Sequence, residues 1–536
     1  MRTVFLIVLT SYGVFGHNGT FPPNFLFGVA HSAYQVEGAW NIDGKKDSIW
    51  DHFVHESPSR ILNNDTGDIA CDSYHLYKDD IRLAAAVGAN MYRFSISWSR
   101  VLPNGDTTII NRRGLRYYER ILQEVRRRDM IPVVTIYHWD LPQSLMDRGI
   151  DWTNPKLVDY FVDYARIVIR QFPHVAYWVT INEPHSFCRQ GYGLGAFAPG
   201  IRSSGKDEYK CIYTALKAHA AVYRMYKREF PHYKGKMSIV YDIQWYKPKN
   251  ASSAEDIAAA RRGLDFDAGL YAHPVFLGGW PPEAEKRIAE RSRLANLTTS
   301  RLPAFSPEEI AFINGTHDFF GVNIYTGVLI ENLPEYNKSI SSYEADVHSD
   351  MSFDPNWTLE AGYFAFAPDT PLHVLKYVKE TYNNPDIMIT EIGASDDGST
   401  LYDHLRVKLF QNYFDSILRA IYDHGVNMIG LTIWSLIDNF EWASGYGIHF
   451  GIYYVDMDDP RRTRYPKMST VYVKQLTSHN RLPAIDSIEP MYRKIVGNVT
   501  SNLNRILDKL NSPSQVKRRS QRPHHHLAAQ SRRIGT

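Results

Sequence analysis

Eight short apolar segments, separated by longer stretches with helical periodicity, constrain the fold of this sequence most strongly. Each segment is a near-continuous run of aliphatic and aromatic residues, which is typical of parallel strands covered on both faces. The segments are residues 25–30, 91–96, 131–137, 175–181, 237–242, 317–323, 386–392 and 426–434. The helical stretches between them include residues 114–128, 156–171, 209–230 and 402–424. This alternation predicts an α/β fold with a parallel sheet.

The sheet could close into a (β/α)8 TIM barrel or stay open and doubly wound. An open sheet normally brings a glycine-rich phosphate loop after an early strand, and no GxGxxG or GxxxxGK[ST] motif occurs here. A closed barrel instead predicts functional polar residues at the carboxyl ends of its strands. Such residues are Arg93, His138, Asn182, Glu183, Asn323, Tyr325, Glu391 and Trp434. We therefore predict a TIM barrel that forms a single domain over residues 17–487.

The two ends of the chain have a different composition from the middle. Residues 1–16 combine one early arginine with a short apolar run, which predicts a secretory signal peptide. Residues 488–511 contain apolar side chains at helical spacing and predict a C-terminal helical extension. Residues 512–536 are basic and poor in large apolar side chains, which predicts a disordered tail.

Secretion is also indicated by potential glycosylation sites and by the cysteines. Asn-X-Ser/Thr sequons occur at Asn18, Asn64, Asn250, Asn296, Asn314, Asn337, Asn356 and Asn498. Cys71, Cys188 and Cys211 are the only cysteines. Cys188 and Cys211 could close a loop in an oxidising compartment, whereas Cys71 is expected to be a small buried side chain. We predict an extracellular glycoprotein, with a lysosomal or other endomembrane lumen as the alternative.

The charge balance excludes some classes of partner. The chain has 60 Lys and Arg against 58 Asp and Glu. Without the signal peptide and the basic tail, the net charge is −5. This is not the field of a nucleic-acid-binding protein. No segment after the signal peptide reaches the length of an apolar membrane span, so no transmembrane segment is expected. Oligomeric state stays open.

Two glutamates end apolar strands in this sequence, and they suggest the chemistry. Glu183 stands in Thr-Ile-Asn-Glu-Pro and Glu391 in Ile-Thr-Glu-Ile-Gly. A single buried glutamate could simply be salt-bridged, but two at one barrel rim favour catalysis. Cleavage of a glycosidic bond needs one carboxyl to protonate the leaving oxygen and another to trap the sugar. GxSxG and HExxH motifs are absent and the cysteines lack metal-ligand spacing, so no metal or cofactor is predicted.

Ten sequence blocks carry a specific resemblance to a known family. They include FLFGVAHSAYQVEGAW (25–40), YRFSISWSR (92–100), TINEP (180–184), ITEIG (389–393) and IWSLIDNFEWASGYGIHFG (433–451). They run from about residue 21 to 482 in the family's order. The chain resembles glycoside hydrolase family 1, the retaining β-glucosidase family, in its secreted animal branch.

The resemblance implies a role for each matching position. Glu183 matches the family's acid/base and Glu391 its nucleophile. Arg93 and Tyr325 match the residues that support the nucleophile, and the cation is expected to lower its pKa. The positions that match substrate-binding residues are Gln35, His138, Asn182, Trp434, Glu441 and Trp442. Glu441 would repel a 6-phosphate, which implies unphosphorylated sugars.

Three positions depart from the family pattern. Ile392 replaces the asparagine that usually follows the nucleophile, His449 replaces an arginine, and His31 replaces a threonine. No departure removes a catalytic group.

The resemblance implies a secreted retaining β-glycosidase that hydrolyses terminal non-reducing β-D-glucosides, with possible tolerance for galactosides or fucosides. One alternative is a thioglucosidase of myrosinase type, or a glucosidase for defensive glycosides. A second alternative is a glycosidase-like binding protein without turnover. The expected partner is a small β-glycoside, and the sequence does not give the aglycone.

Overall fold

The computed structural model describes residues 17–334, 341–362 and 364–497. Eight parallel strands form a closed barrel in the order β1-β13-β12-β7-β5-β4-β3-β2. The strands are β1 (Leu26–Ala30), β2 (Met91–Ser95), β3 (Ile131–Tyr137), β4 (Tyr177–Asn182), β5 (Lys236–Asp242), β7 (Phe320–Ile324), β12 (Ile387–Ile392) and β13 (Met428–Trp434). Each lies within a few residues of its predicted segment. The prediction of a TIM barrel is confirmed.

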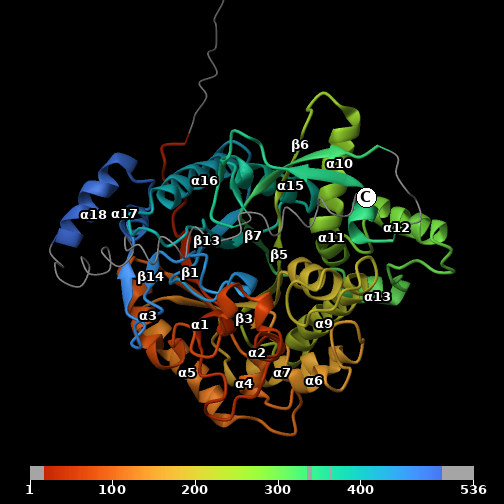
Figure 1. Cartoon of the computed structure of the whole chain (residues 1–536), viewed down its shortest axis with the longest axis horizontal. Coiled ribbons are helices and arrows are strands. Elements are labelled where there is room, and N and C mark those ends of the chain that lie inside the picture. The colour runs from red at the N-terminus through yellow and green to blue at the C-terminus, as the bar shows by residue number, and fades with distance from the viewer. Residues whose placement is uncertain (1–16, 335–340, 363, 498–536) are drawn as a thin grey trace, which may run out of the picture.

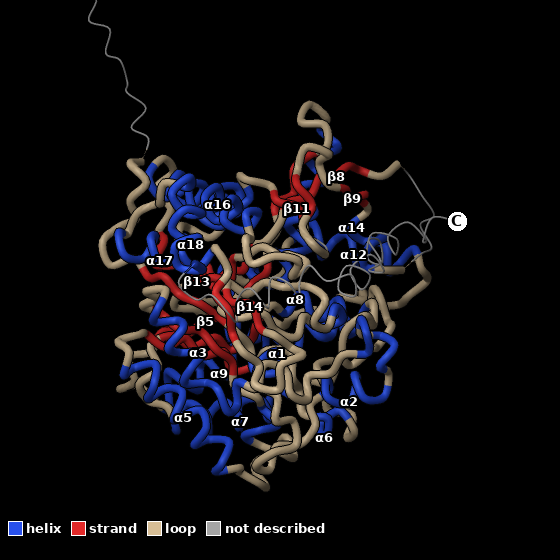
Figure 2. Tube along the Cα trace, turned by 60° about the vertical axis from the view of Figure 1, so that its left-hand side comes forward, coloured by secondary structure: helices blue, strands red, loops and turns tan. Residues whose placement is uncertain are grey.

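Helices surround the barrel strands (Figures 1 and 2). The longer ones are α2 (Ile49–Glu56), α3 (Ser73–Ala86), α5 (Arg112–Arg127), α7 (Leu157–Gln171), α9 (Asp207–Glu229), α10 (Ala254–Leu264), α12 (Pro282–Leu294), α15 (Thr370–Thr381), α16 (His404–Tyr422), α17 (Ser469–His479) and α18 (Ile488–Gly497). Short helices are α1 (Ala33–Val36), α4 (Trp98–Val101), α6 (Gln143–Met146), α8 (Pro184–Phe187), α11 (Leu270–Phe276), α13 (Pro307–Ile313) and α14 (Tyr343–Val347). The four helical stretches predicted from periodicity correspond to α5, α7, α9 and α16.

Two clusters of buried apolar side chains include residues of the barrel strands. The larger cluster includes residues of the strands and the surrounding helices, for example Val134 and Tyr164. A second cluster contains one side chain from each of several strands or their entrances: Met91, Val133, Val179, Val240, Phe319 and Met388. All six are buried. Because Met91 lies two residues before Arg93 on β2, it faces the same side of the sheet, so apolar packing gives way to polar residues along the strand.

Some small strands were not predicted from the sequence. A three-stranded sheet contains β6 (Trp245–Pro248), β8 (Gly327–Asn332) and β9 (Ser349–Ser352). Figure 2 shows β8 and β9 apart from the barrel strands. Two hairpins pair β10 (Thr358–Leu359) with β11 (Ala365–Phe366), and β14 (Tyr453–Val455) with β15 (Arg464–Pro466). Apart from β8, these strands have only two to four residues, too few for the apolar runs that mark the barrel strands.

The cysteines behave as two distinct classes. Cys188 and Cys211 form a disulfide, and Cys71 is free and buried. The disulfide links the segment after β4 to α9.

The predicted signal peptide, the tail, and residues 498–511 of the predicted extension lie outside the described residues, whereas residues 488–497 form α18. None of the described helices is long and apolar enough to cross a membrane.

Candidate active site

Two buried glutamates lie at the carboxyl ends of barrel strands. Glu391 belongs to β12, and Glu183 directly follows β4. Their exposed fractions are 4% and 7%. Glu183 has a φ of 44°, a left-handed conformation that is unfavourable for a residue with a Cβ atom. Such conformations persist where surrounding contacts enforce them, and they concentrate at functional sites.

Glu391 is held by one cation and one hydroxyl group. Arg93 on β2 donates a hydrogen bond from Nη1 to Oε1 of Glu391 at 2.5 Å. The hydroxyl of Tyr325 donates to Oε2 at 2.7 Å. Both carboxylate oxygens therefore have a donor, which fixes the orientation of the carboxyl group.

Arg93 also connects parts of the barrel that are not neighbours in the sheet. It donates from Nη1 to the backbone carbonyl of Thr390 at 2.8 Å and from Nη2 to Oδ1 of Asn182 at 2.6 Å. A longer contact of 3.3 Å joins Nε to Oγ1 of Thr135. The guanidinium group therefore fixes Glu391 and Asn182 relative to each other.

Glu183 has a neutral hydrogen-bond partner. Asn323 on β7 donates from Nδ2 to Oε1 of Glu183 at 2.6 Å. Its amide oxygen accepts from Oγ1 of Thr390 at 2.7 Å, which fixes the amide orientation. Among the residues that the structure describes, no Lys or Arg forms an ion pair with Glu183.

The environment of each carboxyl group determines the direction of its pKa shift. Burial raises the pKa of Glu183 well above its usual value, and the charges of Glu391 and Asp242 act in the same direction. Burial also raises the pKa of Glu391, but Arg93 and the hydrogen bond from Tyr325 oppose this effect. Arg93 therefore lowers the pKa of Glu391 as expected, but desolvation is the larger effect in the free site, so the net shift is upward. Glu183 is the carboxyl that holds its proton more strongly.

Asn182 and His138 lie beside the two glutamates. Nδ2 of Asn182 lies 3.3 Å from Nε2 of His138, and Trp139 donates from its indole to the backbone carbonyl of Asn182 at 3.0 Å. The His138 ring lies nearly parallel to two indole rings, with centroids 5.8 Å from Trp434 and 6.0 Å from Trp442. Nδ1 of His138 is buried and has no partner in the described part of the chain. It is a polar atom available to a ligand.

Gln35 and Glu441 contact each other within reach of the charge of Glu391. Nε2 of Gln35 donates to Oδ1 of Asn439 at 2.9 Å and lies 3.4 Å from Oε2 of Glu441. Its amide oxygen accepts from Ser32 at 2.6 Å. Burial, with a smaller effect of the Glu391 charge, raises the pKa of Glu441 to about 8. The structure thus brings all ten sequence-predicted site residues into one connected region, either by these contacts or by electrostatic proximity.

The three departures from the family pattern lie outside the contacts described above. Ile392 is fully buried in the large core cluster, so its side chain replaces a polar group with core packing. Nδ1 of His449 lies 2.9 Å from Asp438, whose other oxygen contacts Lys467 at 3.0 Å. Nε2 of His31 contacts the Tyr92 hydroxyl at 2.6 Å, and burial lowers the pKa of this imidazole to about 3.

A cluster next to Glu183 was missed by the sequence analysis. Nδ1 of His185 lies 2.9 Å from Asp242 and 3.0 Å from Asp267. The three ligand atoms lie within 4.8 Å of one another, which is a spacing that could hold a cation, but the imidazole already contacts both carboxylates. Asp242 is the last residue of the apolar strand β5, and Glu391 is the last but one of β12. This similar position at a strand's carboxyl end is the signal that could have revealed Asp242.

Comparisons with known proteins agree with this geometry. Residues 17–482 match the family model described as glycosyl hydrolase family 1. The chain is 40% identical over 462 residues to Myrosinase 1 of Brevicoryne brassicae, which covers 85% of this chain and 98% of the relative. It is 38% identical over 466 residues to cytosolic beta-glucosidase of Cavia porcellus, which covers 86% of this chain and 99% of the relative.

Solved structures give the same result. The structure titled aphid myrosinase superposes with a TM-score of 0.83 at 40% identity, covering 86% of this chain and all of the other chain. An eight-stranded barrel, two glutamates at strand ends and a family match across the domain lead to one conclusion. The chain belongs to glycosyl hydrolase family 1 and is a glycoside hydrolase.

Proposed function

We propose that the protein hydrolyses terminal β-D-glucosides with retention of configuration, using Glu183 as acid/base and Glu391 as nucleophile. The observation that carries this assignment is the contrast between the two carboxyl environments. Glu391 has a cation and a hydroxyl group on its two oxygens, whereas Glu183 has only an amide donor. A retaining mechanism needs one ionised and one protonated carboxyl at the start of the reaction.

In the first step, Oε of Glu391 attacks the anomeric carbon while the bond to the aglycone oxygen breaks. Glu183 gives its proton to that oxygen, so the aglycone leaves as a neutral alcohol. The sugar is then an ester of Glu391. In the second step, Glu183 removes a proton from water, the water oxygen attacks the anomeric carbon, and Glu391 leaves as a carboxylate.

The neighbouring residues are assigned to positioning and sugar binding. Oδ1 of Asn182 already accepts from Arg93, and its Nδ2 lies 3.3 Å from Nε2 of His138, so the second Nδ2 hydrogen is the one assigned to the sugar 2-hydroxyl. Gln35, His138 and Glu441 would hold the outer hydroxyls, and the rings of Trp434 and Trp442 would contact the apolar sugar face.

Proton NMR of the first-formed sugar tests the mechanism. Hydrolysis of an aryl β-glucoside should release the β-anomer before mutarotation. Release of the α-anomer would exclude a glycosyl-enzyme on Glu391. Retention also requires the carboxyl groups to be about 5–5.5 Å apart in the working enzyme.

Thioglucoside hydrolysis is the second candidate, and the 40% identity to an enzyme named myrosinase favours it. A thiol has a pKa of about 8.5, so a thiolate can leave without a proton from Glu183. Glu183→Gln should therefore lose turnover of an alkyl O-glucoside but keep the first step with a thioglucoside. No turnover of any thioglucoside by the wild-type enzyme would reject this candidate.

We also propose that the protein is secreted and glycosylated. The disulfide between Cys188 and Cys211 is expected in an oxidising compartment. All six sequon asparagines in the described ranges have exposed side chains: Asn18, Asn64, Asn250, Asn296, Asn314 and Asn356. Asn337 and Asn498 lie outside those ranges. Amino-terminal sequencing of the mature protein should give a start near residue 17, and a mature chain that begins at Met1 would contradict secretion.

A further inference from the structure

A row of arginines crosses the outside of the barrel on α5. Residues 112–128 contain seven Arg and two Glu, although the folded part of the chain has a net charge of −5. The positions 112, 113, 116, 120 and 127 fall within about 100° of one another around a helix of 3.6 residues per turn. All five arginines are exposed. The row extends over about 22 Å, at 1.5 Å per residue.

Several of these cations have no partner within the protein. Among the described residues, the side chains of Arg112, Arg116, Arg120 and the nearby Lys78 form no hydrogen bond or ion pair. By contrast, Arg127 and Arg128 each contact Glu124 at 2.7 Å. A surface with several unpaired cations and a neutralised acid attracts anions from solution.

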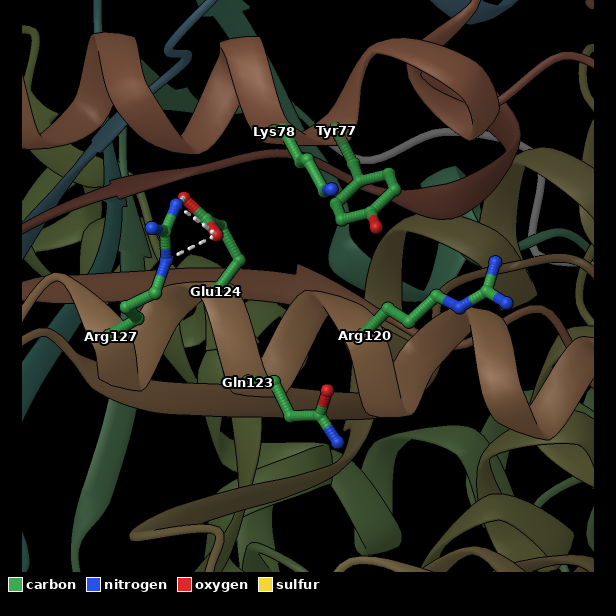
Figure 3. A pocket seen from close by; sticks show the side chains of 6 residues that line it. All are labelled: Tyr77, Lys78, Arg120, Gln123, Glu124 and Arg127. Carbon is green, nitrogen blue, oxygen red and sulfur yellow. Dashed lines mark hydrogen bonds and ion pairs between the residues drawn. The ribbon is translucent and has the colours of Figure 1, made fainter.

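The row borders a cavity of about 430 Å³ between α3 and α5. We call this cavity the basic groove and define it by its lining residues, which are Tyr77, Lys78, Arg120, Gln123, Glu124 and Arg127. Figure 3 shows Tyr77 and Lys78 projecting from α3 toward α5, with Arg120 on the facing helix. The volume falls in the range of small-molecule sites, about 300–1,000 Å³. None of these six residues contacts the candidate active site by a hydrogen bond or ion pair in the described ranges.

We propose that the basic groove and the arginine row bind a sulfated polysaccharide chain, outside the active site. The row supplies several cations along one line, which suits an extended chain with repeating anionic groups. Arginine binds sulfate-like oxygens through its planar fork of N–H donors. The half-buried ring of Tyr77 gives an apolar wall on which a sugar face can stack.

The test measures binding of a heparin-derived decasaccharide to the full-length protein by calorimetry at 50 and 200 mM NaCl. The triple variant Lys78→Gln/Arg116→Gln/Arg120→Gln should lose at least tenfold in affinity at 50 mM NaCl. The control triple variant Arg170→Gln/Lys234→Gln/Lys408→Gln removes the same charge from exposed positions elsewhere and should stay within twofold of wild type. Equal losses in both variants, or no loss in the first, would overturn the proposal.

Further measurements distinguish a sulfated polysaccharide from other anionic ligands. A completely desulfated decasaccharide keeps its carboxylates and should bind at least tenfold more weakly, since the proposal assigns the anion to sulfate. Equal binding of that chain, or tighter binding of duplex DNA or of phosphatidylserine vesicles, would overturn the assignment. Tyr77→Leu should weaken decasaccharide binding about threefold, and an unchanged affinity would contradict the contact with the sugar face. Turnover of an aryl glucoside should be the same in all variants, because none of the changed residues lies in the active site.

Discussion

Asn323 donates a hydrogen bond from Nδ2 to Oε1 of Glu183 at 2.6 Å. The Asn323 amide is neutral, whereas the charges of Glu391 and Asp242, which also act on Glu183, are negative. The amide orients the carboxyl group without placing a positive charge on it. The acid therefore keeps its proton at a pH at which an exposed glutamate would have lost it. This arrangement leads to a pH prediction for Asp242.

Asp242→Asn should shift the alkaline limb of the kcat/KM profile to lower pH. The Asp242 carboxylate raises the pKa of Glu183, so its removal lowers that pKa and deprotonates the acid earlier as pH rises. The ratio of activity at pH 8 to that at pH 6 should fall about threefold, and the acid limb should not move. Asp386→Asn, which removes a half-exposed carboxylate that pairs with Lys236, serves as the control. An unchanged alkaline limb in Asp242→Asn would show that Asp242 does not act on Glu183.

Arg93→Met should shift the acid limb of the same profile to higher pH. Arg93 opposes the effect of burial on Glu391, so its loss raises the pKa of Glu391 and delays ionisation of the nucleophile. Loss of one partner from a buried ion pair costs about 3–5 kcal/mol. Where that whole cost falls on the transition state, kcat/KM decreases by roughly 150- to 5,000-fold. Arg93→Lys retains the charge and should show the smaller shift of the limb. A profile that keeps its shape in the Met variant would remove Arg93 from the control of Glu391.

Glu391→Gly should abolish turnover, and added azide or formate should restore part of it. The anion would fill the space left by the carboxylate and attack the anomeric carbon from the same face, giving an α-linked product. The product can be identified by mass spectrometry and NMR. More than about one tenth of wild-type kcat in the variant without anion would contradict the nucleophile assignment.

Glu441→Gln should lose less activity than Glu441→Ser when assayed at pH 6. Burial raises the pKa of Glu441 to about 8, so the free enzyme holds this carboxyl largely neutral below that pH. The repulsion of a 6-phosphate expected from a charged Glu441 would then act only above that pH. Gln keeps a neutral group of the same shape, and loss of a neutral hydrogen bond costs about 0.5–1.5 kcal/mol, or about 2–13-fold in kcat/KM. Ser should lose more than tenfold because it leaves the sugar hydroxyls without a partner. Equal losses in the two variants would indicate that the shape of Glu441 is irrelevant to sugar binding. A lower melting temperature with unchanged kcat/KM would indicate a structural role for its loop.

The barrel was predictable because its strands are buried on both faces and therefore read as continuous apolar runs. The same signal fails for β6, where Trp245 and Pro248 bound a strand of four residues that carries a lysine. Glu183 and Glu391 could be identified because each follows such a run within a specific motif. The side-chain direction of Ile392 could not be predicted, because a residue beside the nucleophile can face either the site or the core.

The His185 cluster shows a second limit of sequence reading. Its members come from α8, from the end of β5 and from the helical turn at residues 265–269, and no spacing along the chain connects them. The pairing of β4 with β5 in the sheet brings the imidazole close to two aspartates that are distant in the sequence. The net direction of the Glu391 pKa shift could not be predicted for a related reason. The presence of Arg93 can be seen in the sequence, but the depth of burial that outweighs it cannot.

The contacts of Arg93 have a consequence for how this enzyme should fail on heating. Its hydrogen bonds run from β2 to β4 and β12, neither of which is a neighbour of β2 in the sheet. They act as a brace across the barrel, so the strands cannot separate at this level without parting Glu391 from its cation. Loss of catalysis and loss of the barrel should then be one thermal event, and residual activity during heating would report directly on the fraction of intact barrels.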